Sequence, residues 1–136
     1  KTTNGTINTN LITGEDIKLE TINGKINYNQ GQVKNAVIKT INGTINTDLV
    51  GLNSEHKNLD TVNGSININL EDLTRPIKLE ASKLSKLLSN LDVSNEFTEA
   101  VEDDKKSILT TKSYTEDAEN KLLIEASTVN GRISVE

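Results

Sequence analysis

Hydrophobic and polar residues alternate in short arms along this chain, and the arms break at Asn-Gly pairs. In Ile17-x-Leu19-x-Thr21 every second position is apolar or β-branched, which is the pattern of a strand with one buried face. After Asn23-Gly24 the alternation resumes. Asn and Gly both tolerate positive φ, so the pair predicts a sharp turn or corner. The pattern therefore predicts an all-β protein built from units of strand, turn and strand.

The same phrase returns along the chain, so the units are copies of one repeat. TINGKIN at 21–27 is followed by TINGTIN at 40–46 and TVNGSIN at 61–67. The first three intervals between Asn-Gly pairs are 19, 19 and 21 residues, whereas the last is 67, about three periods, which predicts degenerate copies inside it. The structural turn residues of the five clear copies are Asn4, Gly5, Asn23, Gly24, Asn42, Gly43, Asn63, Gly64, Asn130 and Gly131.

One degenerate copy is predicted where residues 79–88 align with residues 124–133, which places Ser85 and Lys86 in the Asn-Gly slot. A weaker match near Ile108 would give one more unit. The leucines of the stretch 84–91 also have helical spacing, so a short helix is the alternative there.

The residues that recur at equivalent positions distinguish two architectures. In a meander of hairpins, Asn-Gly would join antiparallel neighbours; in a solenoid it is a corner of each coil, and equivalent residues stack in columns. Stacked coils explain shared arm residues, because identical side chains then pack or hydrogen-bond at about 4.8 Å. We therefore predict a β-helix or β-solenoid of about six to seven coils of roughly 20 residues, with an antiparallel β-sandwich of hairpins as the alternative. The columns are Thr2, Thr21, Thr40, Thr61 and Thr128; Ile7, Ile26, Ile45, Ile66 and Ile133; and Asn8, Asn27, Asn46 and Asn67.

Length and composition indicate one domain with an aliphatic core. The chain has 136 residues, of which 33% are hydrophobic, and it contains no Trp, Met or Cys. Residues 1–136 are predicted to form a single β-solenoid domain. Because residues 1–5 already lie inside a copy of the phrase, a fragment of a longer protein is expected. Residues 92–121 are predicted to be an irregular acidic insertion or a projecting loop.

The phrase T-[IV]-N-G-x-I-x-[VI], best preserved at 127–135 and 60–68, resembles the repeat of a family of bacterial adhesin domains of poorly defined function. The five copies spread this resemblance over most of the chain. It implies a repetitive β fold in a cell-envelope or extracellular protein, linked in some members to envelope-stress responses. It supplies no catalytic residues, and residues 84–120 depart from the pattern because Asn-Gly is lost there.

The sequence contains no motif that assembles a catalytic or metal site. His56 is the only histidine, lies in a polar, loop-like stretch and is interpreted as solvated. Adjacent acids such as Glu15-Asp16 point to opposite faces if they lie on a strand. No catalytic, metal or cofactor-binding residue is predicted, and no cofactor is expected.

Charge and polarity limit the partners that we expect. The net charge is −5 and no Lys/Arg cluster stands beside aromatic residues, so no nucleic acid is expected. No apolar run approaches the roughly 18 residues of a membrane span. The Asn and Thr columns are explained by β propensity and stacked hydrogen bonds, or else by a flat polar array for a glycan or cell-wall polymer. The acidic residues predicted to bind a partner, such as a cationic peptide, are Glu96, Glu99, Glu102, Asp103 and Asp104.

These patterns predict a non-enzymatic binding module of the cell envelope or surface, with a protein, glycan or cell-wall ligand. Two alternatives stay open. One is a polysaccharide-active β-helix enzyme. The other is an oligomerisation scaffold that self-associates through the unpaired strand edges at the solenoid ends.

Overall fold

All regular structure in the described part of the chain is β-strand, which confirms the all-β prediction. The computed structural model describes residues 1–29, 32–49, 55–70, 74–82, 84–87, 97–103 and 106–136. The alternation of apolar and polar residues explains this outcome, because a strand with one buried face needs a period of two.

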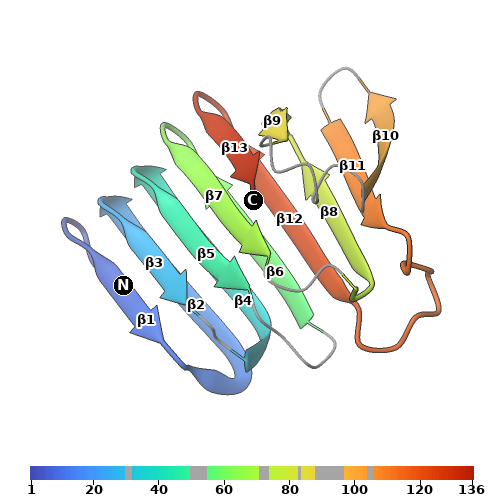
Figure 1. The fold of residues 1–136 in the computed structure, drawn as a ribbon. Coiled ribbons are helices and arrows are strands. Elements are labelled where there is room, and N and C mark those ends of the chain that lie inside the picture. The colour runs from blue at the N-terminus through green and yellow to red at the C-terminus, as the bar shows by residue number, and fades with distance from the viewer. Residues whose placement is uncertain (30–31, 50–54, 71–73, 83, 88–96, 104–105) are drawn as a thin grey trace.

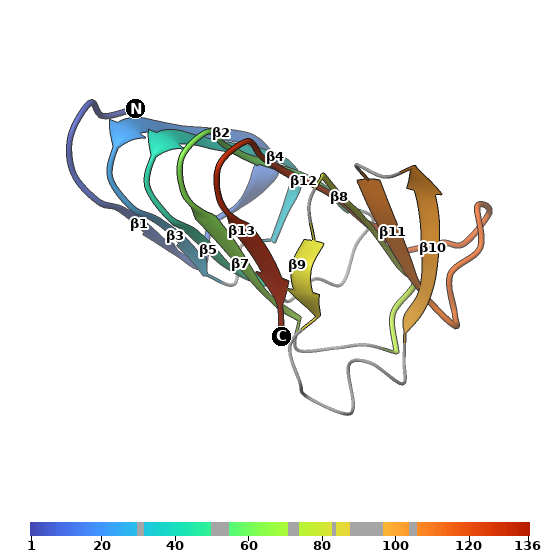
Figure 2. The ribbon, with the colours of Figure 1, turned by 90° about the horizontal axis from the view of Figure 1, so that it is seen from above.

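The strands form two sheets, which face each other as separate layers in Figure 2. Sheet 1 contains, in order, β1 (Ile7–Asn10), β3 (Ile26–Asn29), β5 (Ile45–Leu49), β7 (Ser65–Leu70), β13 (Arg132–Val135) and β9 (Leu84–Leu87). Sheet 2 contains, in order, β10 (Phe97–Asp103), β11 (Lys106–Thr111), β8 (Ile77–Ala81), β12 (Leu122–Thr128), β6 (Glu55–Thr61), β4 (Gln32–Asn42) and β2 (Thr13–Asn23). Figure 1 shows β10 and β11 at the end of the molecule farthest from β1 and β2.

Four of the five Asn-Gly turns carry the chain from sheet 2 to sheet 1, so each of these repeats gives one strand to each sheet; Asn4-Gly5 precedes β1, the first strand. The two-strand units formed in this way are β2–β3, β4–β5, β6–β7 and β12–β13. Equivalent strands of neighbouring units pair in parallel, and Ile45 lies between Ile26 and Ile66 in sheet 1. These Asn-Gly pairs therefore do not close hairpins between antiparallel neighbours, as the sandwich alternative required.

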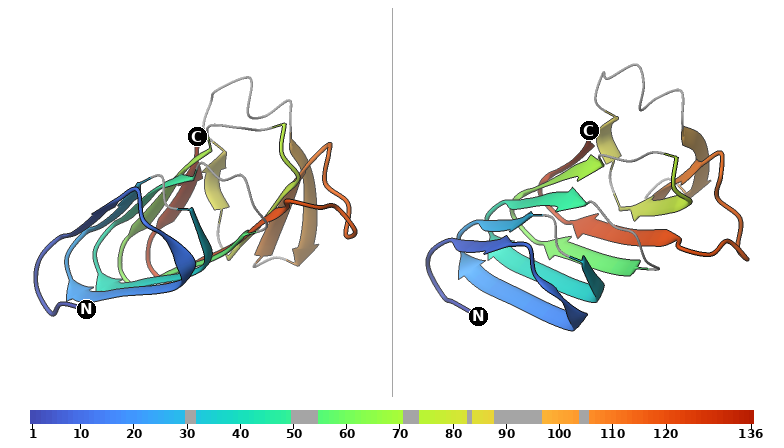
Figure 3. Two further views of the ribbon diagram at one scale, coloured as in Figure 1. Left: turned by 90° about the horizontal axis from the view of Figure 1, so that it is seen from below. Right: turned by 60° about the horizontal axis from the view of Figure 1, so that its bottom comes forward.

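The order of the units in space differs from their order in the sequence. The 67-residue gap predicted degenerate copies stacked between the fourth clear copy and the last. Instead, β12 pairs with β6 and β13 pairs with β7, so the last copy lies directly beside the fourth. β8 and β9 lie on the far side of β12 and β13, as Figure 3 shows. The last copy fits this place because it carries the Thr, Asn and Ile that continue the columns, whereas β8 and β9 do not.

The prediction of a degenerate copy at residues 79–88 is correct for the first strand and wrong for the position of the turn. Leu79 pairs with Ile124, as the alignment predicted. Lys86, however, lies within β9 and pairs with Ser134, so Ser85 and Lys86 do not occupy the turn slot. At the other corners the Asn and Gly residues stack on those of the neighbouring repeat. Ser85 and Lys86 are neither Asn nor Gly, so they cannot form the same contacts. The described part of this leucine-rich stretch is strand, and the helix alternative is wrong for it.

Described residues of the segment 92–121 extend sheet 2 instead of adding another unit. β10 and β11 pair antiparallel, and β11 pairs antiparallel with β8. The weak repeat match near Ile108 is therefore wrong, since a repeat strand would be parallel to its neighbour. After β11 the chain turns back towards β12, with hydrogen bonds from the Tyr114 amide to the Thr111 carbonyl and from the Ala118 amide to the Thr115 carbonyl.

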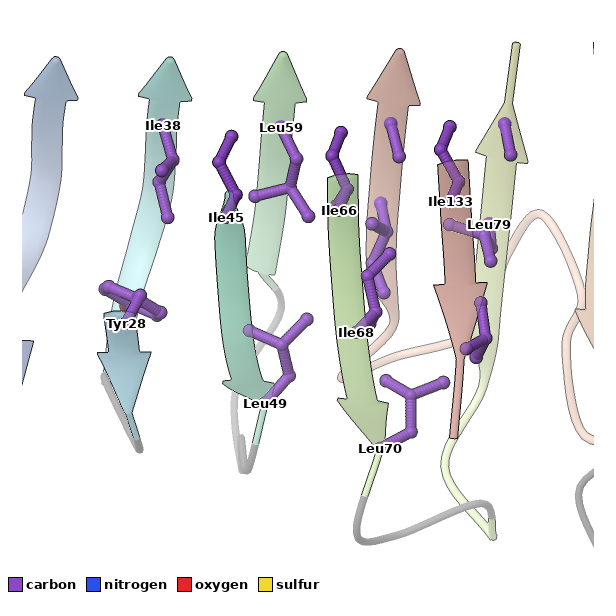
Figure 4. Close-up of a cluster of buried hydrophobic side chains, with 14 of the residues drawn as sticks. Tyr28, Ile38, Ile45, Leu49, Leu59, Ile66, Ile68, Leu70, Leu79 and Ile133 are labelled. Atoms are coloured by element: carbon purple, nitrogen blue, oxygen red, sulfur yellow. The ribbon is translucent and has the colours of Figure 1, made fainter. Parts of the chain in front are cut away.

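The core lies between the two sheets and is mainly aliphatic (Figure 4). Ile26, Ile45, Ile66 and Ile133 stack in register and are fully buried. Burial of each such side chain contributes about 1.5–3 kcal/mol, so this column supplies a large part of the stability. The isoleucine that follows Asn-Gly in the repeat phrase is thus a core residue. The alternate positions of the same strands therefore face outward.

Candidate functional site

The outward side chains of sheet 1 form a flat polar surface, which we call the amide face. Successive side chains of a strand point to opposite faces, so the residues that alternate with the buried isoleucines point outward. The parallel register stacks the outward residues in columns, of which two follow the buried isoleucines. Ser65 and Arg132 pair at the outward position just before the isoleucines. The first column is Asn8, Asn27, Asn46, Asn67 and Ser134. The second column is Asn10, Asn29, Asp48, Asn69 and Glu136.

Hydrogen bonds connect every member of the first column to the next. The Nδ2 of Asn27 donates to Asn8 Oδ1 at 2.6 Å, and Asn46 donates to Asn27 at 2.8 Å. Asn67 donates to Asn46 at 2.7 Å, and the Ser134 hydroxyl donates to Asn67 Oδ1 at 2.8 Å. The column is therefore held as one ladder across five strands, which fixes the orientation of its amide groups.

The ladder leaves part of the hydrogen-bonding capacity of each amide for other partners. An Asn side chain has two N–H donors, and its oxygen has two acceptor lone pairs. An interior residue such as Asn46 uses one donor and one acceptor along the ladder. One N–H and one lone pair then remain at each such residue. The first column thus offers a donor and an acceptor at each of its interior asparagines, Asn27, Asn46 and Asn67, repeated at about 4.8 Å. Ser134 is buried and donates its hydroxyl hydrogen to Asn67.

The second column adds negative charge beside the ladder. Asn69 Nδ2 donates to Asp48 Oδ1 at 3.1 Å. A hollow of about 430 Å³ lies over this part of the face, and its lining includes Asn46, Asn67, Asp48 and Glu136. The hollow therefore brings amides of the first column together with two carboxylates of the second.

A second ladder runs along the corner where the chain passes between the sheets. Asn23 donates to Asn4 at 2.9 Å, Asn42 to Asn23 at 2.8 Å, and Asn63 to Asn42 at 2.9 Å. Asn130 then donates to Asn63 at 2.9 Å, although 67 residues separate them in the chain. The structure thus brings together the Asn residues of all five predicted turns.

Glycine is required at most of these corners by close contact, not by positive φ as the sequence suggested. A Cβ on Gly43 would lie 1.7 Å from the carbonyl oxygen of Gly24, and a Cβ on Gly64 would lie 1.7 Å from that of Gly43. Among the described glycines only Gly5 has a positive φ, of 131°. The backbones of adjacent repeats approach so closely that a side chain has no room.

The outward face of sheet 2 differs from the amide face because its charges are paired. The hydrogen bond from Lys18 lowers the pKa of Glu20, and the hydrogen bond from Lys106 lowers the pKa of Glu80. Three such pairs are Lys18–Glu20 at 2.9 Å, Lys39–Asp60 at 3.5 Å and Lys106–Glu80 at 2.7 Å. A neutral polar ligand on this face would have to compete with these existing pairs.

A buried ion pair lies inside the core, at a place that sequence reasoning did not single out. Lys57 is fully buried, its Nζ lies 3.1 Å from Glu55 Oε2, and it donates to the Val33 carbonyl. Burial lowers the pKa of Lys57, while Glu55 opposes that shift. The ammonium also lies 5.6 Å from the centre of the Tyr28 ring. Burial raises the pKa of Tyr28 to about 12. Lys57 is thus paired within the core, whereas Glu55 Oε1 and the Tyr28 hydroxyl have no hydrogen-bond partner among the described residues. None of these groups belongs to the amide face.

His56 lies on strand β6 and not in a loop, which corrects the sequence interpretation. It pairs with Asn35 of β4 and Leu123 of β12. Its Nε2 is 3.6 Å from Glu125 Oε2, and the side chain is about half exposed. Its neighbours Glu55 and Lys57 are polar but buried, so this strand lacks the alternation of apolar and polar residues that predicts a strand.

Of the five predicted acidic residues, the three that the structure describes lie on sheet 2 and not on the amide face. Glu99, Glu102 and Asp103 lie on β10, the last strand of sheet 2, where Glu99 pairs with Leu109. Glu96 and Asp104 lie outside the described residues. The structure thus separates these acids from the Asn columns.

The sequence indicated the first Asn column but missed the second. The sequence pattern that corresponds to the second column is Ile-Asn-x-Asn in β1 and β3, which continues as Ile-Asn-x-Asp in β5. The last residue of each pattern belongs to the second column. No sequence pattern indicated the buried Lys57–Glu55 pair. Charged residues two apart on a strand lie on the same face, and such a face is normally expected to be exposed to solvent.

In the described parts of the chain, no group of three or more His, Cys, Asp or Glu residues is arranged to hold a metal. Nor do those residues form any helix able to cross a bilayer. Comparison with family models, curated proteins and solved structures finds no match to this chain. The resemblance to adhesin domains therefore depends on the repeat residues alone.

Proposed function

We propose that this chain is a β-solenoid that acts as a non-enzymatic binding module of the bacterial cell envelope or surface, and that its amide face binds a repetitive polar polymer. The observation that carries the proposal is the hydrogen-bonded ladder of the first column, which orients equivalent amides on four strands and ends at the Ser134 hydroxyl on a fifth.

The strand order supports the solenoid. Units β2–β3, β4–β5, β6–β7 and β12–β13 each place one strand in each sheet, and equivalent strands pair in parallel. Stacking of this kind brings identical residues into contact, and both Asn ladders are its direct products. Each coil then contributes one equivalent set of outward groups to the amide face.

The arrangement of free donors and acceptors favours a polymer over a small ligand. A small molecule needs a concave site with a few convergent polar groups. Apart from the hollow beside Asp48 and Glu136, the amide face instead offers the same weak hydrogen bonds at regular intervals across the strands. One neutral hydrogen bond contributes only about 0.5–1.5 kcal/mol, so useful affinity requires a ligand that repeats along the ladder.

The cell-envelope location is supported by the repeat phrase and its resemblance to bacterial adhesin domains. Polymers of the envelope are long, polar and repetitive, which fits the geometry of the amide face. Both arguments start from the same repeat residues, since the phrase copies at 21–27, 40–46 and 61–67 end at Asn27, Asn46 and Asn67 of the first column.

Binding to isolated bacterial cell walls tests this proposal with two matched variants. Asn67 and Asn63 are both exposed, and each donates one hydrogen bond and accepts one within its ladder. N67A removes an amide from the amide face, whereas N63A removes one from the corner ladder. We expect intact walls to co-sediment the natural chain and N63A, and to retain N67A at least about threefold less well.

The stability of both variants is measured by thermal unfolding, so that loss of fold is separated from loss of contact. Equal retention of N67A and N63A at equal stability would mean that the amide face is not the binding surface. Failure of the natural chain to bind any wall preparation would remove the envelope polymer from the proposal.

A further inference from the structure

We propose that the ligand of the amide face is an extended, uncharged β-1,4-linked glycan that lies along the ladders, across the strands of sheet 1. This inference rests on the proposed function and names the class of polymer that the face would take. Four features of the face lead to it: spacing, hydrogen-bonding capacity, charge and the lack of aromatic rings.

Spacing selects an extended glycan. Neighbouring strands of a sheet lie about 4.8 Å apart, and the register of β1, β3, β5 and β7 repeats the amide positions at that interval, with Ser134 at the equivalent position of β13. A β-1,4-linked glycan is a straight ribbon that advances by close to one strand spacing per sugar. Successive sugars would therefore meet successive amides. An α-1,4-linked glycan of the same sugars coils and cannot follow a straight column.

Hydrogen-bonding capacity matches the edge of such a ribbon. Each interior Asn of the first column retains one N–H donor and one acceptor lone pair beyond the ladder. A sugar hydroxyl can donate one hydrogen bond and accept others. One hydroxyl per sugar can therefore engage one amide per strand without disturbing the ladder beneath it.

Charge favours an uncharged glycan over an anionic wall polymer. Asp48 and Glu136 line the hollow on the amide face beside Asn46 and Asn67. The whole chain carries a net charge of −5. Arg132 is also exposed on this side of sheet 1, so the face as a whole carries charges of both signs. In the hollow itself, however, a chain of phosphate groups would be repelled by the two carboxylates, whereas the hydroxyl groups of a neutral sugar can donate to them.

The lack of aromatic rings on this face makes ligand length decisive. Tyr28 lies in sheet 1 but is fully buried and points into the core (Figure 4), and none of the ten column residues is aromatic. A sugar therefore has no ring to stack on and depends on several weak hydrogen bonds at once. Affinity should rise with each sugar until the ligand spans the five strands of the ladder and then level off.

The test is a titration of the chain with soluble oligosaccharides, followed by calorimetry or by chemical shifts of the Asn side-chain amides. Cellohexaose is the probe, and maltohexaose is its matched control because it contains the same sugars in α-1,4 linkage. We expect cellohexaose to bind at least about tenfold more tightly than maltohexaose. We also expect each glucose added from two to five to strengthen binding at least about twofold.

Variants connect this binding to the amide face. N67A should weaken cellohexaose binding about three- to tenfold, while N63A should leave it unchanged. Equal binding of the two hexaoses, or no dependence on length, would overturn the glycan assignment. If walls are still retained in an Asn67-dependent way, the proposed binding face stands and its ligand is of another class. If neither walls nor hexaoses bind through Asn67, both proposals fail.

Discussion

The corner glycine of each repeat faces the carbonyl oxygen of the glycine in the neighbouring repeat. At Gly43 an added Cβ would lie 1.7 Å from the Gly24 oxygen, which is backbone and cannot rotate away. The substitution G43A must therefore separate two repeats that the Asn ladder and the Ile column hold together. We expect G43A to lower the free energy of unfolding by at least about 3 kcal/mol, measured by chemical denaturation.

Gly14 provides the matched control for this prediction. It lies in β2, its φ is not positive, and an added Cβ would meet no atom within 4 Å. We expect G14A to be neutral or stabilising by up to about 1 kcal/mol, because alanine restricts the unfolded chain more than glycine. Similar losses in G43A and G14A would show that the corner contact is not what requires glycine.

Tyr28 provides a prediction of pH dependence. Its hydroxyl is buried and, among the described residues, has no hydrogen-bond partner. Burial raises its pKa to about 12 in the folded chain, from 10.0 when unperturbed. Its contribution to stability is therefore complete below pH 10 and is lost as the pH rises towards 12, because the unfolded chain ionises first.

The variant Y28F isolates this effect. We expect Y28F to be as stable as the natural chain at pH 7, or about 1–3 kcal/mol more stable, since it removes an unpaired hydroxyl. Between pH 10 and 12 the natural chain should lose stability that Y28F retains, in parallel unfolding titrations. The same pH profile in both proteins would mean that Tyr28 is not the group that titrates.

At the scale of elements, the sequence predicted strands well and their neighbours less well. Alternation predicted β2 through β7 because each strand has one buried face. It could not predict that β12 lies between β6 and β8, since pairing depends on which side chains continue a column. The Thr61–Thr128 and Ile66–Ile133 pairs were visible as repeats, yet counting periods through the 67-residue gap placed other coils between them.

The antiparallel strands β10 and β11 show a second limit. Their sequence carries neither the repeat phrase nor an Asn-Gly turn, so the period gave no information about them. They extend sheet 2 through β8, which has no other described neighbour on that side. The acidic composition of this segment suggested a partner site, but composition alone could not place it relative to the Asn columns.

At the scale of the whole molecule, the first column of the candidate site could be predicted and the second column could not. Asn8, Asn27, Asn46 and Asn67 are identical, so they are visible as a repeat. The second column mixes Asn with Asp48 and Glu136, and it became a column only when the register was known. The buried Lys57–Glu55 pair likewise depends on sheet-to-sheet packing, which no local pattern encodes.

The described strands of residues 1–70 and 122–136 pair side by side in one continuous stack, and strands β8 to β11 extend the end of that stack. β5 belongs to one unit of this stack and β6 to the next, and residues 50–54 connect them in the chain. β7 and β12 likewise belong to adjacent units of the stack. All ten residues of the amide face lie outside the segment 71–121.

The most direct test is to replace residues 71–121 by a five-residue Gly/Ser link, the length of the natural link between β5 and β6. We predict a protein that unfolds cooperatively in denaturant, at lower stability because β12 and β13 each lose one parallel neighbour. It should retain Asn67-dependent binding to cell walls. A shortened protein that does not fold cooperatively, under conditions where the full chain does, would contradict the claim that the last repeat continues the stack independently of the inserted segment.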